Sequence, residues 1–211
     1  GAENALMAEV SDLPACAVIR VGGAVRWQFE VYFEGTRAVS GVTPEFEDIE
    51  RLLAAEPALD VVYSCGVGDP DPIEIPAALL ALRRGAGDTL ALRVHDYFPV
   101  SPSYTLLDSQ GSFQSVPPID TTDSAHFSFR PSGEKASLDQ WRAAWAPLVS
   151  AADEVRAFSY ASAELMERAF AGANITVLPH AMPHQPGLVR SGGRAIGLLG
   201  NLNHQKGAHI L

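Results

Sequence analysis

The chain has 211 residues, 47% of them hydrophobic, which is enough to bury the core of one large domain or of one domain plus part of another. Its 15 basic and 25 acidic residues give a formal charge of −10, which argues against a nucleic-acid binder because such proteins need a basic patch for phosphates. No apolar run is long enough for a membrane span, and the start lacks a signal-peptide pattern. The two cysteines, Cys16 and Cys65, lie in apolar strand-like runs, so we expect small buried side chains in a cytoplasmic protein rather than a disulfide.

A β-hairpin is predicted near the start of the chain. Residues 16–21 and 25–33 are strand-like, and the Gly-Gly pair between them is typical of a tight hairpin turn. From Trp27 to Phe33 every second residue is a large apolar one, so we expect this set to form one buried face.

Strands and helices then alternate, which predicts an α/β fold class with a Rossmann-like, mainly parallel sheet flanked by helices. A helix opens after Thr43-Pro44, and Pro147 is expected to kink a later helix or to begin a new first turn. Residues 105–137 have no sustained period, and a loop of that length indicates either function or mobility. The other expected strands are 59–64, 89–94, 154–158 and 175–178, and the other expected helices are 73–84, 138–151 and 161–171.

Beyond residue 182 the composition changes. Proline and glycine are frequent over 183–193, which is typical of a linker, and a fresh strand at 194–200 begins a predicted second domain over 194–211. The first domain is then 1–182. Without a sheet of its own, strand 194–200 is expected to be an edge that pairs with the first domain or with another chain in a dimer. The incomplete first and last elements indicate a fragment of a longer enzyme.

The best candidate site follows the strand at 89–94. His95 and Asp96 stand at the carboxyl end of this strand, where open α/β sheets place their ligands, and a stiff Pro-rich loop comes next. In one interpretation His95 meets the substrate as a hydrogen-bond donor or proton-transfer group, which suits an imidazole that titrates near neutral pH. In the other, His95 is an ordinary loop histidine and Asp96 caps the following turn.

Residues 66–72 form a second polar segment, between a strand and a helix. A phosphate-binding loop occupies such a place, and the spacing of Asp69 and Asp71 imitates a carboxylate pair that holds a metal–nucleotide. The two carboxylates would repel phosphate, however, and a third glycine is missing. A Pro-rich turn that caps the helix is therefore the favoured interpretation.

The remaining candidates lie in the last third of the chain. No further ligands stand at a metal-binding spacing from the histidines, so no metal is expected; these histidines are His180, His184, His204 and His209. Residues 200–207 place Lys206 and backbone N–H groups at the start of a helix, which suits a diphosphate, although an exposed turn with a surface lysine is the simpler account.

Taken together, these segments resemble the bacterial polysaccharide-building glycosyltransferases of family 4, which have two Rossmann-like domains in the GT-B fold. Residues 94–113, VHDYFPVSPSYTLLDSQGSF, look like a segment of that family in which His-Asp is followed by two aromatics, proline, Cys-Pro-Ser and Leu-Leu-Asp. The order of Trp141-Arg142, Ser159 and 177–180 is similar to the end of the family's N-terminal domain. Residues 195–207 are similar to the first strand and donor-phosphate loop of its C-terminal domain, so the resemblance covers residues 59–211.

The resemblance implies an N-terminal domain that binds the acceptor and a C-terminal domain that binds a nucleotide-sugar donor, with chemistry between them. The family is retaining and metal-independent and needs no cofactor. His95 would be the catalytic residue, as a transition-state stabiliser that reaches the transferred sugar or its phosphate, and Lys206 would hold the donor diphosphate. The other implied substrate-binding residues are Asp96, Tyr97, Ser159, His180 and Asn203. The acceptor would be a glycan or a lipid-linked glycan in cell-surface polysaccharide synthesis, with peripheral membrane association.

The chain also departs from the family. Ser101 stands where the family has a cysteine, and the family's Gly-rich loop and C-terminal acidic motif have no counterpart, so these residues alone are expected to have little or no transferase activity. One alternative is a non-catalytic Rossmann-like module that binds a sugar or a partner. Another is a nucleotide-dependent dehydrogenase, disfavoured because no complete G-x-G-x-x-G follows a strand.

Overall fold

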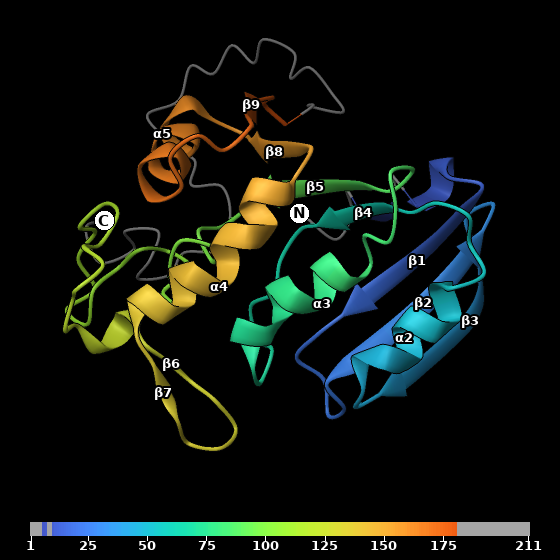
Figure 1. Cartoon of the computed structure of the whole chain (residues 1–211), viewed down its shortest axis with the longest axis horizontal. Coiled ribbons are helices and arrows are strands. Elements are labelled where there is room, and N and C mark those ends of the chain that lie inside the picture. Colours follow the sequence, from blue (N-terminus) through green and yellow to red (C-terminus); the bar gives the residue numbers. More distant parts are fainter. Residues whose placement is uncertain (1–5, 8–9, 181–211) are drawn as a thin grey trace, which may run out of the picture.

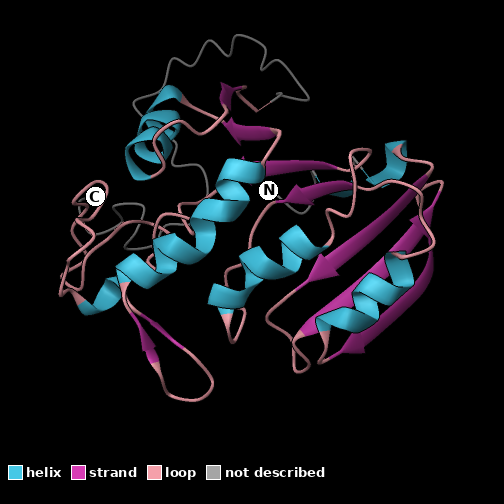
Figure 2. Cartoon of the chain, viewed as in Figure 1, coloured by secondary structure: helices cyan, strands magenta, loops and turns pink. Residues whose placement is uncertain are grey.

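The computed structural model describes residues 6–7 and 10–180, which form a mixed α/β fold (Figures 1 and 2). A four-stranded parallel sheet has the order β4-β5-β8-β9, and a separate three-stranded antiparallel sheet has the order β1-β2-β3. The parallel strands are β4 (Asp60–Tyr63), β5 (Thr89–Val94), β8 (Glu154–Ala157) and β9 (Ile175–Val177). The helices are α2 (Phe46–Leu53), α3 (Ile75–Ala81), α4 (Leu138–Ala151) and α5 (Tyr160–Ala169), with 3-10 turns η1 (Pro72–Glu74) and η2 (Ser124–His126).

The parallel sheet and its flanking helices confirm the predicted α/β class. Its strands agree with the predicted ones to within one residue at each end, because each is a short apolar run bounded by glycine, proline or polar residues. Helices connect successive parallel strands, as such crossovers require, and Figure 1 shows α3 and α4 side by side along the sheet.

Two tryptophans of α4 fill the space between this helix and the parallel sheet. Trp141 and Trp145 are one helical turn apart, share one face and are fully buried. The Trp145 ring lies 5.2 Å from that of Tyr63 on β4, and the Trp141 ring lies 5.0 Å from that of Phe98 after β5. Truncating a buried ring of this kind to alanine costs about 3–5 kcal/mol. The sheet edge that follows β5 therefore rests on a rigid aromatic support.

The helix α4 runs unbroken through Pro147, so the predicted new first turn at that residue is wrong. A capping box holds its start, where the Ser137 hydroxyl accepts from the Gln140 N–H and the Gln140 side chain accepts from the Ser137 N–H.

The antiparallel sheet contains the predicted hairpin, but the connection between the two strands is longer and a third strand is added. The strands β1 (Ala15–Arg20) and β2 (Trp27–Phe33) are joined by residues 21–26 rather than by a two-residue Gly-Gly turn, and β3 (Thr36–Thr43) was not expected. Arg26, at the end of this connection, forms an ion pair with Asp69 at 3.0 Å. β3 escaped prediction because most of its residues are exposed and show little apolar alternation.

The predicted buried face of β2 is only partly buried. Trp27 is buried as expected, but Phe33 of the same predicted set is 54% exposed. Tyr32, from the alternate set, is buried instead, because it packs with Val10 and Val18 in a second, smaller cluster.

Side-chain hydrogen bonds, more than regular structure, hold residues 105–137. Within this segment the only strands are β6 (Ser128–Phe129) and β7 (Lys135–Ala136), which are two residues long each and pair with one another. Backbone N–H groups donate to the carboxylates of Asp108 and Asp123, and Arg142 of α4 donates to the Pro117 carbonyl at 2.8 Å. These local polar contacts explain why the segment shows no period in the sequence.

No helix within residues 6–7 and 10–180 is long and apolar enough to cross a bilayer. The predicted linker at 183–193, the strand at 194–200, and both Asn203 and Lys206 lie outside the described residues.

Candidate functional site

Three parallel strands end side by side, and the residues that follow them form the candidate site. Val94 of β5 pairs with Ala157 of β8, so the next residues in the chain, His95 and Phe158, are neighbours. β9 continues the same edge, and His180 follows it after a short Leu-Pro step. Carboxyl edges of open parallel sheets are the usual place for ligands because the loops there converge.

The rings of His95, Phe158 and His180 form an aromatic cluster at this edge. Ring centroids are 4.6 Å apart for His95 and Phe158, 3.8 Å for Phe158 and His180, and 5.4 Å for the two histidines, with all planes within 20° of parallel. Phe158 therefore contacts both imidazoles and limits their rotation. His95 is half-buried and His180 is exposed, so the cluster can meet a ligand from solvent.

Asp96 supports the loop after β5. Its carboxylate accepts a hydrogen bond from the Phe98 N–H at 3.0 Å, which is the local turn that this residue type favours. Burial raises the pKa of the Asp96 carboxyl, while hydrogen bonds from the Phe98 N–H and from the Cys65 thiol oppose that shift. These contacts match the predicted turn-capping role of Asp96.

Cys65 follows β4 and lies against Asp96. It is exposed, so the expectation of a buried side chain is wrong: β4 ends at Tyr63 and leaves Cys65 in the next loop. Although the residue is exposed overall, partial burial of the sulfur raises the pKa of the Cys65 thiol to about 11; a backbone hydrogen bond from Val67 opposes this shift, and the nearby Asp96 carboxylate adds to it. The thiol therefore stays protonated at neutral pH and donates to Asp96.

A chain of hydroxyl groups begins at the N-terminus of α5. Ser159 caps this helix by accepting from the Ser162 N–H, and its hydroxyl donates to that of Ser162 at 3.0 Å. The Ser162 hydroxyl lies 3.1 Å from the Tyr97 hydroxyl in the loop after β5. The helix presents the positive end of its dipole at this point, so the carboxyl edge combines imidazoles, hydroxyls and a helix N-terminus.

The acidic segment at 66–72 has a structural role. Arg26 binds the Asp69 carboxylate through two nitrogens, at 3.0 and 3.2 Å, and donates to the Asp71 carbonyl at 2.8 Å. Arg130 binds the other carboxylates, those of Asp71 and Glu74. The favoured prediction of a turn that leads into a helix agrees with η1, which begins directly after Asp71.

Five predicted site residues gather at or beside the carboxyl edge: His95, Asp96, Tyr97, Ser159 and His180. Sequence reasoning missed Phe158 and Ser162 there. Phe158 was predicted to end its strand, and a position directly after β8 is one from which a side chain can join the edge. For Ser162, the Ser-x-x-Ser spacing at the start of α5 is a usable sign of a helix cap. Among the described residues no group of three or more histidine, cysteine or acidic side chains could hold a metal.

Fold and site together define an α/β protein with an open parallel sheet and a histidine, aromatic and hydroxyl cluster at its carboxyl edge. No protein-family model, no curated protein and no solved structure matches the chain.

Proposed function

We propose that the chain is the acceptor-binding part of a retaining glycosyltransferase of the GT-B type, similar to family 4. Such an enzyme transfers a sugar from a nucleotide-sugar to a glycan or lipid-linked acceptor, here in cell-surface polysaccharide synthesis. The observation that supports this most is the contact between His95 and His180, whose rings lie 5.4 Å apart. They come from two family-like segments that are 85 positions apart in the sequence, yet they meet at the carboxyl edge of the sheet.

In this proposal His95 hydrogen-bonds to the transferred sugar or its phosphate and stabilises charge that develops in the transition state. A front-face reaction allows the leaving phosphate itself to take the acceptor proton, so His95 need not act as the base. The Ser159 hydroxyl and the positive end of α5 favour an anionic or hydroxyl-rich group at the same edge. Asp96 and Tyr97 hold the loop that carries His95, and Asn203 and Lys206 contact the donor diphosphate.

The test is transfer of a labelled sugar by the native protein, assayed with a panel of nucleotide-sugars and oligosaccharide acceptors. The variant His95→Ala is expected to lower kcat about a hundredfold with little change in the donor KM, a typical contribution of one catalytic group. A urea unfolding midpoint close to that of the wild type shows that the fold is retained. Wild-type turnover in His95→Ala contradicts the proposed role.

Two other outcomes overturn the proposal itself. Glycan binding that His95→Ala abolishes, with no turnover by the native protein for any nucleotide-sugar, indicates the non-catalytic binding module. Tight binding of a nicotinamide cofactor, with hydride transfer, indicates the dehydrogenase.

A further inference from the structure

The side chain of Ser162 joins two segments of the candidate site at a place where strand pairing has ended. The backbone pairing of β5 with β8 ends at Val94 and Ala157, one residue before His95 and Phe158. Beyond this point the loop after β5 and the start of α5 lie outside the paired strands. Side-chain contacts must therefore set the position of the loop relative to α5.

Two side-chain contacts connect the loop with this part of the chain. The rings of His95 and Phe158 are stacked, with centroids 4.6 Å apart, and the Tyr97 hydroxyl oxygen lies 3.1 Å from that of Ser162. Ring contacts tolerate a range of offsets, whereas a hydrogen bond is restricted in both distance and angle. The contact between Tyr97 and Ser162 is therefore the more exact of the two.

The Tyr97 side chain extends from a backbone that is itself well held. Its N–H donates to the Tyr104 carbonyl at 2.8 Å, and its carbonyl accepts from the Val100 N–H at 2.9 Å. The carbonyl of the next residue, Phe98, accepts from the buried Trp141 ring N–H at 2.9 Å. Since Trp141 belongs to α4, the contact with Ser162 connects the same loop to a second helix, and a shift of Tyr97 moves the backbone that carries His95.

Ser162 occupies the third position of α5, and its contacts differ from those of the matching residue in α4. In α4 that residue is Gln140, whose side chain accepts from the N–H of the capping residue Ser137. In α5 the Ser162 hydroxyl accepts from the hydroxyl of the cap Ser159 at 3.0 Å and also contacts Tyr97. Ser162 is half-buried, so water competes for this contact less than it does at the exposed Ser159.

From these contacts we propose that Ser162 is a positioning residue, which acts through Tyr97 to keep the His95 ring against Phe158 at the carboxyl edge. The inference rests on the proposed transferase function, in which His95 stabilises charge in the transition state. Ser162 itself needs no contact with substrate for this role. Misplacement of a reacting group by about 1 Å can cost about a hundredfold in rate, so a partial loss of alignment should lower kcat.

The test compares Ser162→Ala with Tyr97→Phe, because each variant removes one partner of the same hydroxyl contact. In the native protein each is expected to lower kcat for sugar transfer about tenfold with the donor KM unchanged. The double variant should lose no more than either single variant, since the contact can be removed only once. Ser162→Thr restores a hydroxyl and should recover the wild-type kcat.

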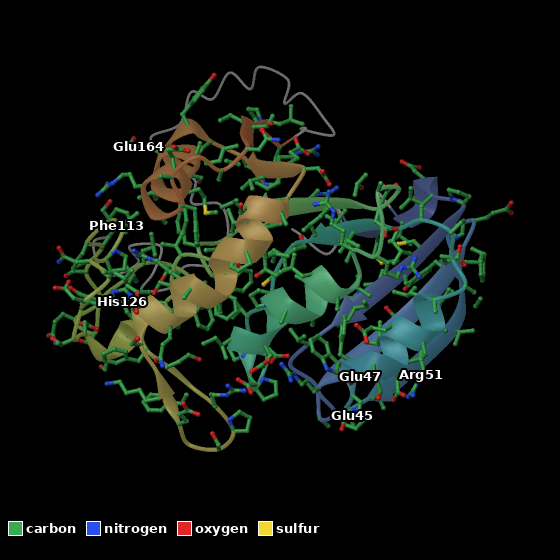
Figure 3. The ribbon with its side chains drawn as sticks, viewed as in Figure 1. Glu45, Glu47, Arg51, Phe113, His126 and Glu164 are labelled. Atoms are coloured by element: carbon green, nitrogen blue, oxygen red, sulfur yellow. The ribbon has the colours of Figure 1, made fainter. Side chains whose placement is uncertain are left out.

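NMR of the full chain measures the alignment of His95 without turnover. Nuclear Overhauser effects between the ring protons of His95 and Phe158 are expected in the wild type and should weaken in Ser162→Ala and in Tyr97→Phe. Two control variants should leave these effects unchanged. Glu164→Gln alters an exposed residue of the same helix (Figure 3), and Tyr32→Phe removes a tyrosine hydroxyl that donates to a glutamate in the antiparallel sheet.

An unchanged ring contact in both Ser162→Ala and Tyr97→Phe overturns the proposal. A wild-type kcat in the two variants, additive losses in the double variant, or a kcat that Ser162→Thr does not recover also overturns it. If the native protein transfers no sugar at all, the proposed function fails, and the ring contact alone then supports or overturns the link from Ser162 to His95.

Discussion

The first two histidines after β5, His95 and His126, occupy opposite environments. His95 lies at the open carboxyl edge, half-buried and in ring contact with Phe158 at 4.6 Å. His126 is 2% exposed and lies 2.8 Å from the Ser101 hydroxyl through its Nδ1 atom. The Ser101 oxygen also accepts a hydrogen bond from the Ser103 N–H. His95 is thus placed to meet a ligand, whereas His126 links two parts of the long segment between β5 and β6.

The buried position of His126 also changes its pKa. Burial lowers the pKa of His126, while the carboxylates of Asp123 and Asp108 oppose the shift. Burial therefore favours the neutral form of His126. A histidine held in this way can stabilise the fold but is poorly placed for proton transfer to a ligand.

The largest expected effect is on stability. His126→Ala removes a fully packed ring and its hydrogen bond with the buried Ser101 hydroxyl, so the free energy of unfolding should fall by about 2–4 kcal/mol. His95→Ala should change it by less than about 1 kcal/mol, because His95 is only half-buried. Urea unfolding followed by tryptophan fluorescence measures both. Similar losses in the two variants would contradict the distinction between a structural and a ligand-facing histidine.

A smaller effect is expected from pH. The native pKa of His126 lies below the ordinary value of 6.5, so below that pH the unfolded chain binds a proton before the native protein does. This group therefore makes stability fall as pH drops from about 6.5 toward its native pKa, by up to about 1.4 kcal/mol per pH unit. Unfolding free energies measured between neutral pH and pH 5 should show this slope, and His126→Gln should reduce it.

Asp96 changes the pH dependence of stability in the direction opposite to that of His126. Its native pKa is raised by burial, so as pH falls through that value the native protein takes up a proton more readily than the unfolded chain. Its contribution to the free energy of unfolding therefore rises as pH drops toward 3.8, the ordinary pKa of this carboxyl in the unfolded chain. Asp96→Asn should make the acid loss of stability steeper in this lower window. An unchanged profile in both His126→Gln and Asp96→Asn would mean that other groups control the acid response.

The sequence was sufficient for the parallel sheet and for much of its carboxyl edge. The runs that became β5, β8 and β9 are short, apolar and clearly bounded, and the residues after parallel strands must converge. His95, Ser159 and His180 each follow such a run closely, so their position at one edge could be predicted without knowledge of side-chain contacts.

Other features depend on contacts between distant residues. Arg26, in the connection between β1 and β2, forms an ion pair with Asp69, and nothing near Arg26 in the sequence indicates it. The burial of Tyr32 depends on its packing with Val10 and Val18, which the alternation within β2 does not reveal. The hydrogen bond between Ser101 and His126 likewise joins residues that are 25 positions apart.

The smallest expected effect concerns the two helix caps. Ser159 caps α5 at the candidate site, and Ser137 caps α4 away from it through a capping box. Replacing either serine with alanine removes one hydrogen bond to a helix N–H group, so each variant should lose about 1 kcal/mol of stability in urea unfolding. Equal stability losses make the pair a matched test of function.

Ligand-dependent measurements should separate the two variants. If the Ser159 hydroxyl contacts substrate, Ser159→Ala should lower kcat/KM for sugar transfer by more than its small stability loss explains, whereas Ser137→Ala should retain wild-type kcat/KM. Ser159 also donates to Ser162, which lies 3.1 Å from Tyr97, so its loss should shift the Tyr97 signals in NMR spectra. Equal kcat/KM in the two variants would limit Ser159 to its capping role and leave His95 and His180 as the ligand-facing groups of the edge.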